Sequence, residues 1–174
     1  MIIRNATQVG NPIIRKRSKP IRMVKSAETR KLVKNLTDSM RYHDLVGMAA
    51  PQIGVNLRVF VTEVRKTKTR NPKLVDPLRV FINPRIVRFS NKKALIWEGC
   101  GSVARSNLFS IVRRPAEVTV VALDQKGNKF RLSAKGLLAR IIQHETDHLD
   151  GRVFLDRISD TKTLMSREEY VKKA

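Results

Sequence analysis

The chain has 174 residues, of which 41% are apolar and 29% charged, a composition typical of one globular domain over residues 1–174. It holds 1 cysteine, which excludes an internal disulfide framework, and no apolar run approaches the roughly 20 residues of a membrane-spanning helix. The formal net charge of +21 favours anionic partners, with RNA or a ribosomal surface first and an acidic membrane second.

The N-terminal segment is basic and contains no acidic residue before Glu28, as in many transit peptides. However, Pro12 and Pro20 interrupt any amphipathic helix there, and no apolar segment follows the basic one as in a secretory signal. We therefore interpret the segment as part of the mature protein.

The first predicted helix begins after Ser26, a favourable N-cap residue, and continues through Glu28. Its apolar residues recur at helical spacing on one face: Leu32, Val33, Leu36 and Met40. A connection marked by glycine and proline (42–54) then leads to a predicted strand over 57–64. Residues 65–79 are rich in lysine, arginine and proline, which predicts a solvated basic loop, with RNA contact as the alternative.

Further strands are predicted over 80–83 and 94–97, and a hairpin over 118–123 and 129–132. The last predicted helix covers about 136–150, presents an apolar face and ends at Gly151. One helix, several strands and a final helix predict an α+β fold. We expect mostly antiparallel strands packed around the C-terminal helix, together with the N-terminal helix.

The strongest chemical motif is HETDH at residues 144–148, on this last helix. His144 and His148 are four residues apart, so both side chains lie on one helix face and can bind one metal ion. Glu145 follows the first histidine, where its carboxylate can take a proton from water bound to the metal. The alternative is an ordinary structural helix, but 2 of the chain's 3 histidines stand in this motif.

A third metal ligand is needed, with a fourth position left for water. Cys100, the only cysteine, lies between two glycines in residues 98–102 (EGCGS). It is either a small buried apolar residue or this third ligand. Another polar candidate is Gln52 in residues 47–54 (GMAAPQIG), whose amide could donate a hydrogen bond to a developing oxyanion if the fold brings it to the metal.

These three segments, in this order, resemble the peptide deformylase family. The family patterns are a glycine-rich segment ending in AAPQ, an EGCφS segment and a QHExDH segment, which correspond here to residues 45–52, 98–102 and 143–148. The similarity extends to residues 10–15 and 114–155, so it covers most of the chain.

The resemblance implies an enzyme that removes the formyl group from the initiator methionine of nascent polypeptides and releases formate. Cys100, His144 and His148 would be the metal ligands, and Glu145 the general base on metal-bound water. The Gln52 side chain and the Gly101 backbone N–H would donate to the oxyanion of the tetrahedral intermediate.

The resemblance also implies the substrate contacts. Gly47 would pair through its backbone with the extended substrate, and three residues would line the methionine pocket: Val46, Leu137 and Ile141. Glu98 would pair with a basic residue, with Arg114 as the candidate, to brace the metal loop. The metal would be Fe²⁺ in the cell, although Zn²⁺, Ni²⁺ or Co²⁺ can occupy the site.

The basic charge fits contact with the ribosome surface or ribosomal RNA, and we expect a monomer that binds no membrane. Because the family-like segment begins near residue 8, we expect little room for a presequence. Bacterial cytoplasm is therefore favoured over an organelle of bacterial ancestry.

Three features depart from the family pattern. Leu45 stands in place of the usual first glycine, Gly101 replaces the usual apolar residue, and residues 103–111 do not follow the common pattern. The sequence therefore leaves open which residues after methionine are preferred.

Two other functions remain as alternatives. An HExxH metalloprotease could take Glu168 or Glu169 as the third ligand. A basic RNA- or ribosome-binding protein could retain the same metal fold without catalysis.

Overall fold

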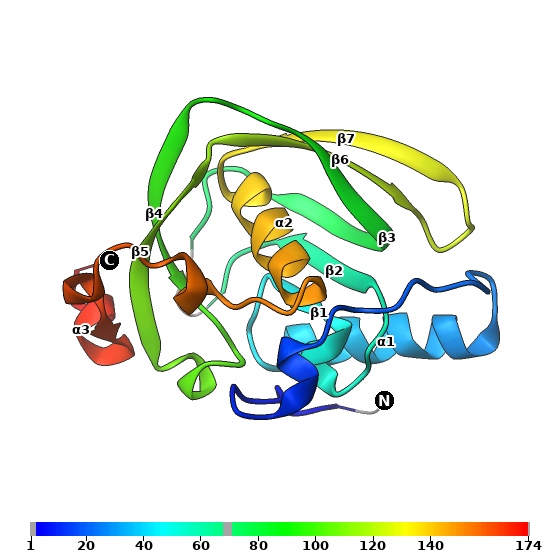
Figure 1. The fold of residues 1–174 in the computed structure, drawn as a ribbon, viewed down its shortest axis with the longest axis horizontal. Helices are drawn as coiled ribbons and strands as arrows, with labels where there is room; N and C mark the ends of the chain where they lie inside the picture. Colours follow the sequence, from blue (N-terminus) through cyan, green and yellow to red (C-terminus); the bar gives the residue numbers. More distant parts are fainter. Residues whose placement is uncertain (1–2, 68–70, 174) are drawn as a thin grey trace.

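Eight strands form two antiparallel sheets in the computed structural model, which describes residues 3–67 and 71–173 (Figure 1). The five-stranded sheet has the order β1-β2-β3-β6-β7. Its strands are β1 (Gly47–Ala49), β2 (Val59–Val64), β3 (Asp76–Phe89), β6 (Glu117–Leu123) and β7 (Lys129–Lys135). The three-stranded sheet has the order β4-β5-β8 and consists of β4 (Lys93–Gly99), β5 (Leu108–Pro115) and β8 (Met165–Ser166). The predicted α+β fold with mostly antiparallel strands is thus confirmed.

Helix α1 (Ala27–Tyr42) begins where the capping pattern predicts. The Ser26 hydroxyl accepts a hydrogen bond from the Thr29 backbone N–H at 3.1 Å. The four predicted core residues are all buried: Leu32, Val33, Leu36 and Met40. They pack with alternate residues of β2, namely Val59 and Val61, because successive side chains of a strand point to opposite faces.

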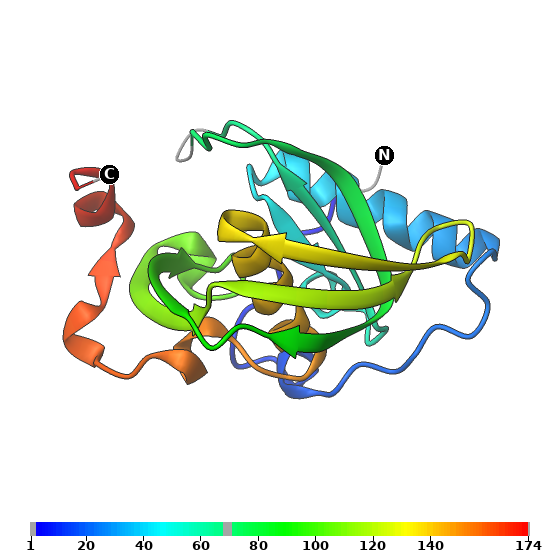
Figure 2. The same ribbon diagram turned by 90° about the horizontal axis from the view of Figure 1, so that it is seen from above.

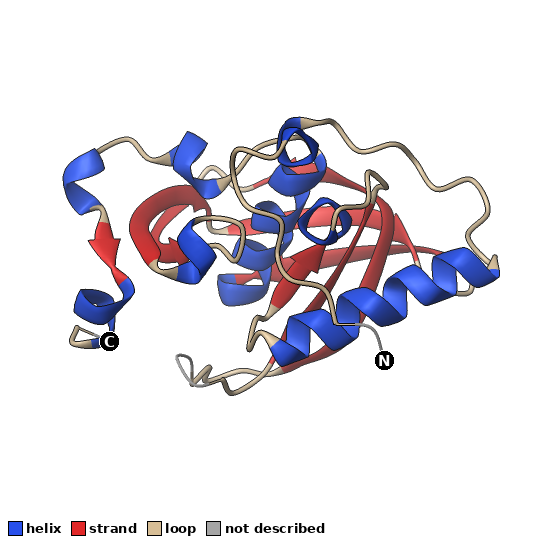
Figure 3. Ribbon diagram, turned by 90° about the horizontal axis from the view of Figure 1, so that it is seen from below, coloured by secondary structure: helices blue, strands red, loops and turns tan. Residues whose placement is uncertain are grey.

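Helix α2 (Gly136–Leu149) packs on the other face of the same sheet. Figure 3, seen from below, shows helices in blue on both sides of the red strands. Phe60, which lies between Val59 and Val61 on β2, packs with Phe81 of β3 and with Ile142 and Leu149 of α2. The helix ends before Gly151, which has a φ of +74°. A side chain at Gly151 would clash with the Arg15 carbonyl, so glycine is required at this turn.

The chain beyond α2 returns to the three-stranded sheet. Short 3-10 helices at Phe154–Arg157 and Thr161–Thr163 lead to β8, which pairs with the start of β5 and is followed by α3 (Arg167–Val171). Figure 2 shows this C-terminal segment beside β4 and β5, at the end of the molecule away from the hairpin of β6 and β7. Other 3-10 helices cover Pro12–Arg15, Ala50–Ile53 and Ala104–Ser106.

Several predictions of local structure were wrong or incomplete. The connection predicted over 42–54 contains β1 and the 3-10 helix at Ala50–Ile53. The predicted basic loop (65–79) includes the first residues of β3, where Asp76 is in register with Val64 of β2 and forms an ion pair with Arg79; residues 68–70 of that loop lie outside the described residues. Strand β5 was not predicted, because buried Ser110 and Arg114 interrupt its apolar alternation. The β6–β7 hairpin is confirmed, although β7 continues to Lys135.

Within the described residues, no helix is both long enough and apolar enough to span a membrane.

Candidate active site

A cleft lies between β1, the loop after β4 and one side of α2. It is lined by the predicted site residues Val46, Gly47, Gln52, Cys100, Gly101, Leu137, Ile141, His144 and Glu145. His148 lies just behind these lining residues and is only 1% exposed. The fold therefore brings together residues that the sequence separates into three distant segments.

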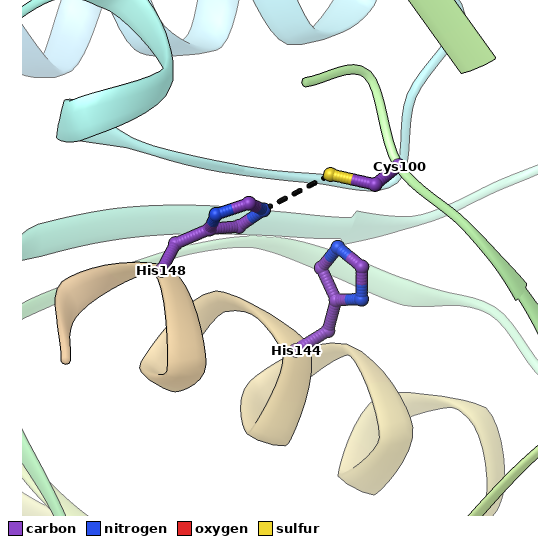
Figure 4. A group of neighbouring side chains, drawn as sticks. All are labelled: Cys100, His144 and His148. Carbon is purple, nitrogen blue, oxygen red and sulfur yellow. Dashed lines mark hydrogen bonds between the residues drawn. The ribbon is translucent and has the colours of Figure 1, made fainter. Parts of the chain in front are cut away.

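Three candidate metal ligands meet at the floor of this cleft. The ligand atoms of Cys100, His144 and His148 all lie within 4.8 Å of one another, and the Cys100 Sγ is 3.1 Å from the His148 Nε2. Figure 4 shows both imidazoles rising from α2 towards the cysteine, which approaches from the end of β4. One thiolate and two imidazoles are a donor set that suits Zn²⁺ and other first-row divalent metals.

Electrostatics favours the ligating form of the cysteine. Burial raises the pKa of the Cys100 thiol, but the neighbouring His148 and His144 imidazoles outweigh that effect and lower it to about 5. A thiolate is the form that binds a metal ion. The residues present therefore fit a divalent metal.

Glu98 orients one of the histidines. Its Oε2 lies 2.9 Å from the His144 Nδ1, so the other ring nitrogen is left to face the cluster. Burial raises the pKa of Glu98, but hydrogen bonds from His144 and Arg114 outweigh burial and hold it well below its usual range. Glu98 is thus a buried carboxylate that stays ionised.

Two buried arginines neutralise Glu98. Arg114 donates to it from Nε at 2.6 Å and from Nη2 at 3.0 Å, as the sequence predicted. Arg140 of α2 also donates to Glu98, at 2.6 Å, and this partner was not predicted. Arg114 reaches Asp147 as well, at 2.6 Å, and Asp147 accepts from Arg157 at 2.6 Å. The metal loop and α2 are therefore joined by a network of paired charges.

Glu145 is the buried acid without a partner. It is 3% exposed, and its Oε2 has no hydrogen-bond partner among the described residues. Burial raises its pKa to about 7, although His144 and His148 act in the opposite direction. A carboxylate with a pKa near neutrality is suited to accept and return a proton.

Gly47 and Gln52 line the opposite side of the cleft. A Cβ at Gly47 would lie 2.5 Å from the Glu145 Oε1 and 2.6 Å from the Ile141 Cγ2, so only glycine leaves room for both side chains. The Gln52 Oε1 accepts from the Ala49 N–H at 2.8 Å. This bond turns the amide nitrogen towards the cluster, where it lies 3.8 Å from the Cys100 Sγ.

One wall of the cleft is aromatic and was not predicted from the sequence; it is formed by Trp97, Phe109 and Tyr170. Tyr170 stacks on Phe109 with ring centroids 4.3 Å apart, and it lies 5.8 Å from Trp97. A Cβ at Gly99 would lie 2.6 Å from the Phe109 ring. Only strand pairing between β4 and β5 reveals this wall, since Gly99 and Phe109 are register partners.

The alternative third ligands lie elsewhere. Glu168 and Glu169 belong to the exposed helix α3, and both form ion pairs with Lys172. Within the described residues, the cluster of candidate ligands contains Cys100 and the two histidines only. This arrangement removes the main reason for a metalloprotease assignment.

Comparison with known proteins agrees with this geometry. The family model of polypeptide deformylase matches residues 3–164. "Peptide deformylase 2" of Gloeobacter violaceus is 41% identical over 87% of this chain and 77% of its own length. "Peptide deformylase 1" of Ralstonia nicotianae is 40% identical over 93% of this chain and 90% of its own length.

Solved structures show the same similarity. A class I type b peptide deformylase from Acinetobacter baumannii superposes with a TM-score of 0.86 at 30% identity, over 91% of this chain and 100% of the other. The peptide deformylase of Ehrlichia chaffeensis gives a TM-score of 0.82 at 32% identity, over 99% of this chain and 94% of the other. The chain belongs to the polypeptide deformylase family, whose members remove the N-formyl group from nascent peptides.

Proposed function

We propose that Cys100, His144 and His148 hold a divalent metal, Fe²⁺ in the cell, for the deformylation of nascent peptides that begin with formyl-methionine. A bound metal ion supplies a Lewis acid that polarises the formyl carbonyl and makes water reactive near neutral pH. The observation that carries the proposal is the unpartnered, buried Glu145 carboxylate beside three convergent metal donors.

Glu145 moves the proton in this reaction. Its carboxylate takes a proton from the attacking water as the water oxygen adds to the formyl carbon. It then gives that proton to the amine of methionine as the C–N bond breaks, so that formate and a free N-terminus are released.

Gln52 and Gly101 stabilise the negative charge that develops on the formyl oxygen. The Gln52 amide is already fixed by its bond to the Ala49 N–H, so it can donate without reorganising. Gly101 follows Cys100 and lines the same cleft, where its backbone N–H is a second donor. Neither donation requires a change in the protonation of the protein.

The substrate binds as an added strand. Gly47 belongs to β1, the edge strand of the five-stranded sheet, so one side of its backbone is not paired with β2. Val46, Leu137 and Ile141 provide the apolar lining for the methionine side chain. The edge strand thus sets the direction of the peptide, and the pocket selects its first residue.

Ribosomal RNA is the macromolecular partner that the charge favours. Behind α2 lies a cavity lined by seven arginines and two aspartates. Four of these arginines form no ion pair within the described part of the chain: Arg17, Arg85, Arg113 and Arg152. Phosphate groups would neutralise this concentration of like charge.

We further infer one catalytic domain over residues 1–174, acting as a monomer in the bacterial cytoplasm.

The test is formate release from a formyl-methionine tripeptide, with protein purified without oxygen and loaded with Fe²⁺. The wild type should turn over, and Glu145→Gln should lose about 10²- to 10⁴-fold in kcat while keeping its bound metal. Metal content is measured on the same samples. Hydrolysis that survives in Glu145→Gln would contradict the role of Glu145, and the absence of turnover in metal-loaded wild type would contradict the function.

A further inference from the structure

The active-site cleft continues into a second cavity on the far side of the cysteine loop. The two cavities share five lining residues: His43, Leu45, Gly101, Ser106 and Arg167. The second cavity, of about 440 Å³, is also lined by Gln8 and Arg105. A peptide whose methionine occupies the first cavity therefore has its following residues within reach of the second, since an extended chain advances about 3.3 Å per residue.

Two guanidinium groups line this second cavity without a carboxylate partner. Arg167 is half-buried and Arg105 is exposed, and neither forms an ion pair within residues 3–67 and 71–173. In contrast, the nearby Arg41 and Arg65 are both paired with Glu63. Unpaired cations that face a cavity are suited to bind an anionic group.

The loop that carries Arg105 is held in an unusual conformation. Three consecutive residues other than glycine have positive φ, namely Ala104 at 46°, Arg105 at 51° and Ser106 at 65°. Such residues avoid this region unless the surroundings impose it. Here the Arg105 N–H donates to the Gln8 Oε1 at 3.0 Å, and the Ser106 N–H donates to the Cys100 carbonyl at 3.2 Å. These hydrogen bonds thus maintain the unfavourable backbone conformation that keeps Arg105 at the cavity.

Arg167 is held there by the C-terminal segment, which continues past the part of the chain that the family model matches. The Arg167 N–H donates to the Asn107 carbonyl at 3.0 Å, and β8 pairs with Leu108 and Phe109. Tyr170 stacks on Phe109 and anchors the following turn. Arg105 and Arg167 therefore approach the cavity from two separate segments.

The other charged or titratable groups at the cavity have partners of their own. The His43 Nε2 lies 2.9 Å from the Arg4 carbonyl oxygen. Asp44, which lines the first cavity, forms an ion pair with Arg65 at 3.4 Å. Neither group neutralises Arg105 or Arg167.

We propose that Arg105 and Arg167 form an anion subsite that selects formylated peptides with an acidic side chain at the second or third position. The proposal rests on the deformylase function, because the methionine pocket sets the position of those residues. It assigns a substrate preference to the segment (103–111) that departs from the family pattern.

The experiment compares kcat/KM for C-terminally amidated formyl-tripeptides that differ at one position. Glutamate, glutamine and lysine are placed second or third after methionine, and the amide removes the terminal carboxylate that could bind the same subsite. We expect glutamate to exceed glutamine by about fivefold at one of the two positions, mainly through KM. The preference should fall in high salt.

In Arg105→Gln/Arg167→Gln, kcat/KM for the glutamate peptides should become about equal to that for the glutamine peptides. Hydrolysis of the glutamine peptides should continue. The matched control is Arg30→Gln/Lys31→Gln, which removes the same charge from the exposed side of α1 and should retain the preference. An equal loss in both variants would show general electrostatic attraction and overturn the subsite.

A peptide-binding measurement separates this proposal from the proposed function. Calorimetric titration of the same peptides into Glu145→Gln reports the subsite without any reaction. Tighter binding of glutamate peptides that disappears in Arg105→Gln/Arg167→Gln supports the subsite even if no peptide is hydrolysed. Equal affinity for glutamate and glutamine peptides overturns it, whatever the turnover of the wild type.

Discussion

The side chain of Leu45 occupies the space beside Gly101: a Cβ at position 101 would lie 3.2 Å from the Leu45 Cδ1. Both residues depart from the pattern of the family, which has glycine at the first position and an apolar residue at the second. Their contact indicates that the two departures compensate each other, because the apolar group comes from the other side of the cleft. Leu45 thus supplies the apolar surface of the cleft wall that the residue at position 101 supplies in the family pattern.

This contact predicts a coupled pair of substitutions. Gly101→Leu alone should overfill the site and lower the free energy of unfolding by about 1–3 kcal/mol, with a parallel loss of kcat/KM. Leu45→Gly/Gly101→Leu should recover part of both losses, with a coupling energy of about 1 kcal/mol. Urea unfolding and formate release measure the two effects. Strict additivity of the single variants would show that the contact carries no energy.

Glu98 should contribute to both stability and metal binding. Glu98→Gln leaves Arg114 and Arg140 without their buried carboxylate, so we expect a loss of about 3–5 kcal/mol in the free energy of unfolding. Metal affinity should fall about 10- to 100-fold, because His144 loses the group that orients it. Glu169→Gln, at an exposed ion pair with Lys172, is the control and should change stability by less than about 1 kcal/mol.

Cys100→Ala should abolish stoichiometric metal binding, because the remaining two imidazoles do not complete the site. Elemental analysis of purified protein measures the bound metal. Glu168→Gln/Glu169→Gln should keep the wild-type metal content. The reverse pattern, with metal retained in Cys100→Ala and lost in the glutamate variant, would restore the metalloprotease assignment.

Gly47→Ala should impair catalysis more than folding. The added methyl group meets the Glu145 carboxylate and the Ile141 side chain, and displacement of the Glu145 carboxylate by about 1 Å can cost about 100-fold in rate. Near-ultraviolet circular dichroism checks that the tertiary structure is kept. Wild-type kcat in this variant would mean that Glu145 has more freedom than its packing indicates.

The ion pair between Glu63 and Arg41 predicts a pH-dependent stability. Hydrogen bonds from Arg41, at 2.9 and 2.7 Å, lower the pKa of Glu63. A lowered pKa in the folded state stabilises the protein above the unfolded value of about 4.3, and this stabilisation is lost as pH falls through the folded value. Glu63→Gln should therefore be less stable than wild type by up to about 1 kcal/mol at pH 7, and equal to it in strong acid.

Urea unfolding at neutral and acidic pH measures this difference. Glu117→Gln is a suitable control, because Glu117 is exposed and forms no ion pair with any described residue. A Glu63→Gln deficit that persists unchanged in acid would show that packing, and not charge, is responsible.

The sequence by itself determined the elements whose signals are local. Ser26 and the apolar spacing of α1 predicted that helix, and four-residue spacing placed His144 and His148 on one face of α2. The ordered motifs also named the family, and with it the candidate ligands and the base. These features depend on neighbours within a few residues, so a linear pattern records them.

Tertiary structure decided how residues from distant segments are brought into contact. Cys100 and His148 are 48 positions apart, and only strand pairing and the position of α2 bring them together. The same holds for the contact of Leu45 with Gly101 and for Arg105 and Arg167 at one cavity. Strand β5 was not predicted because its inward-facing Arg114 interrupts the apolar pattern. The family resemblance implied the pair of Arg114 with Glu98, but the pair with Asp147 follows from the fold and not from local composition.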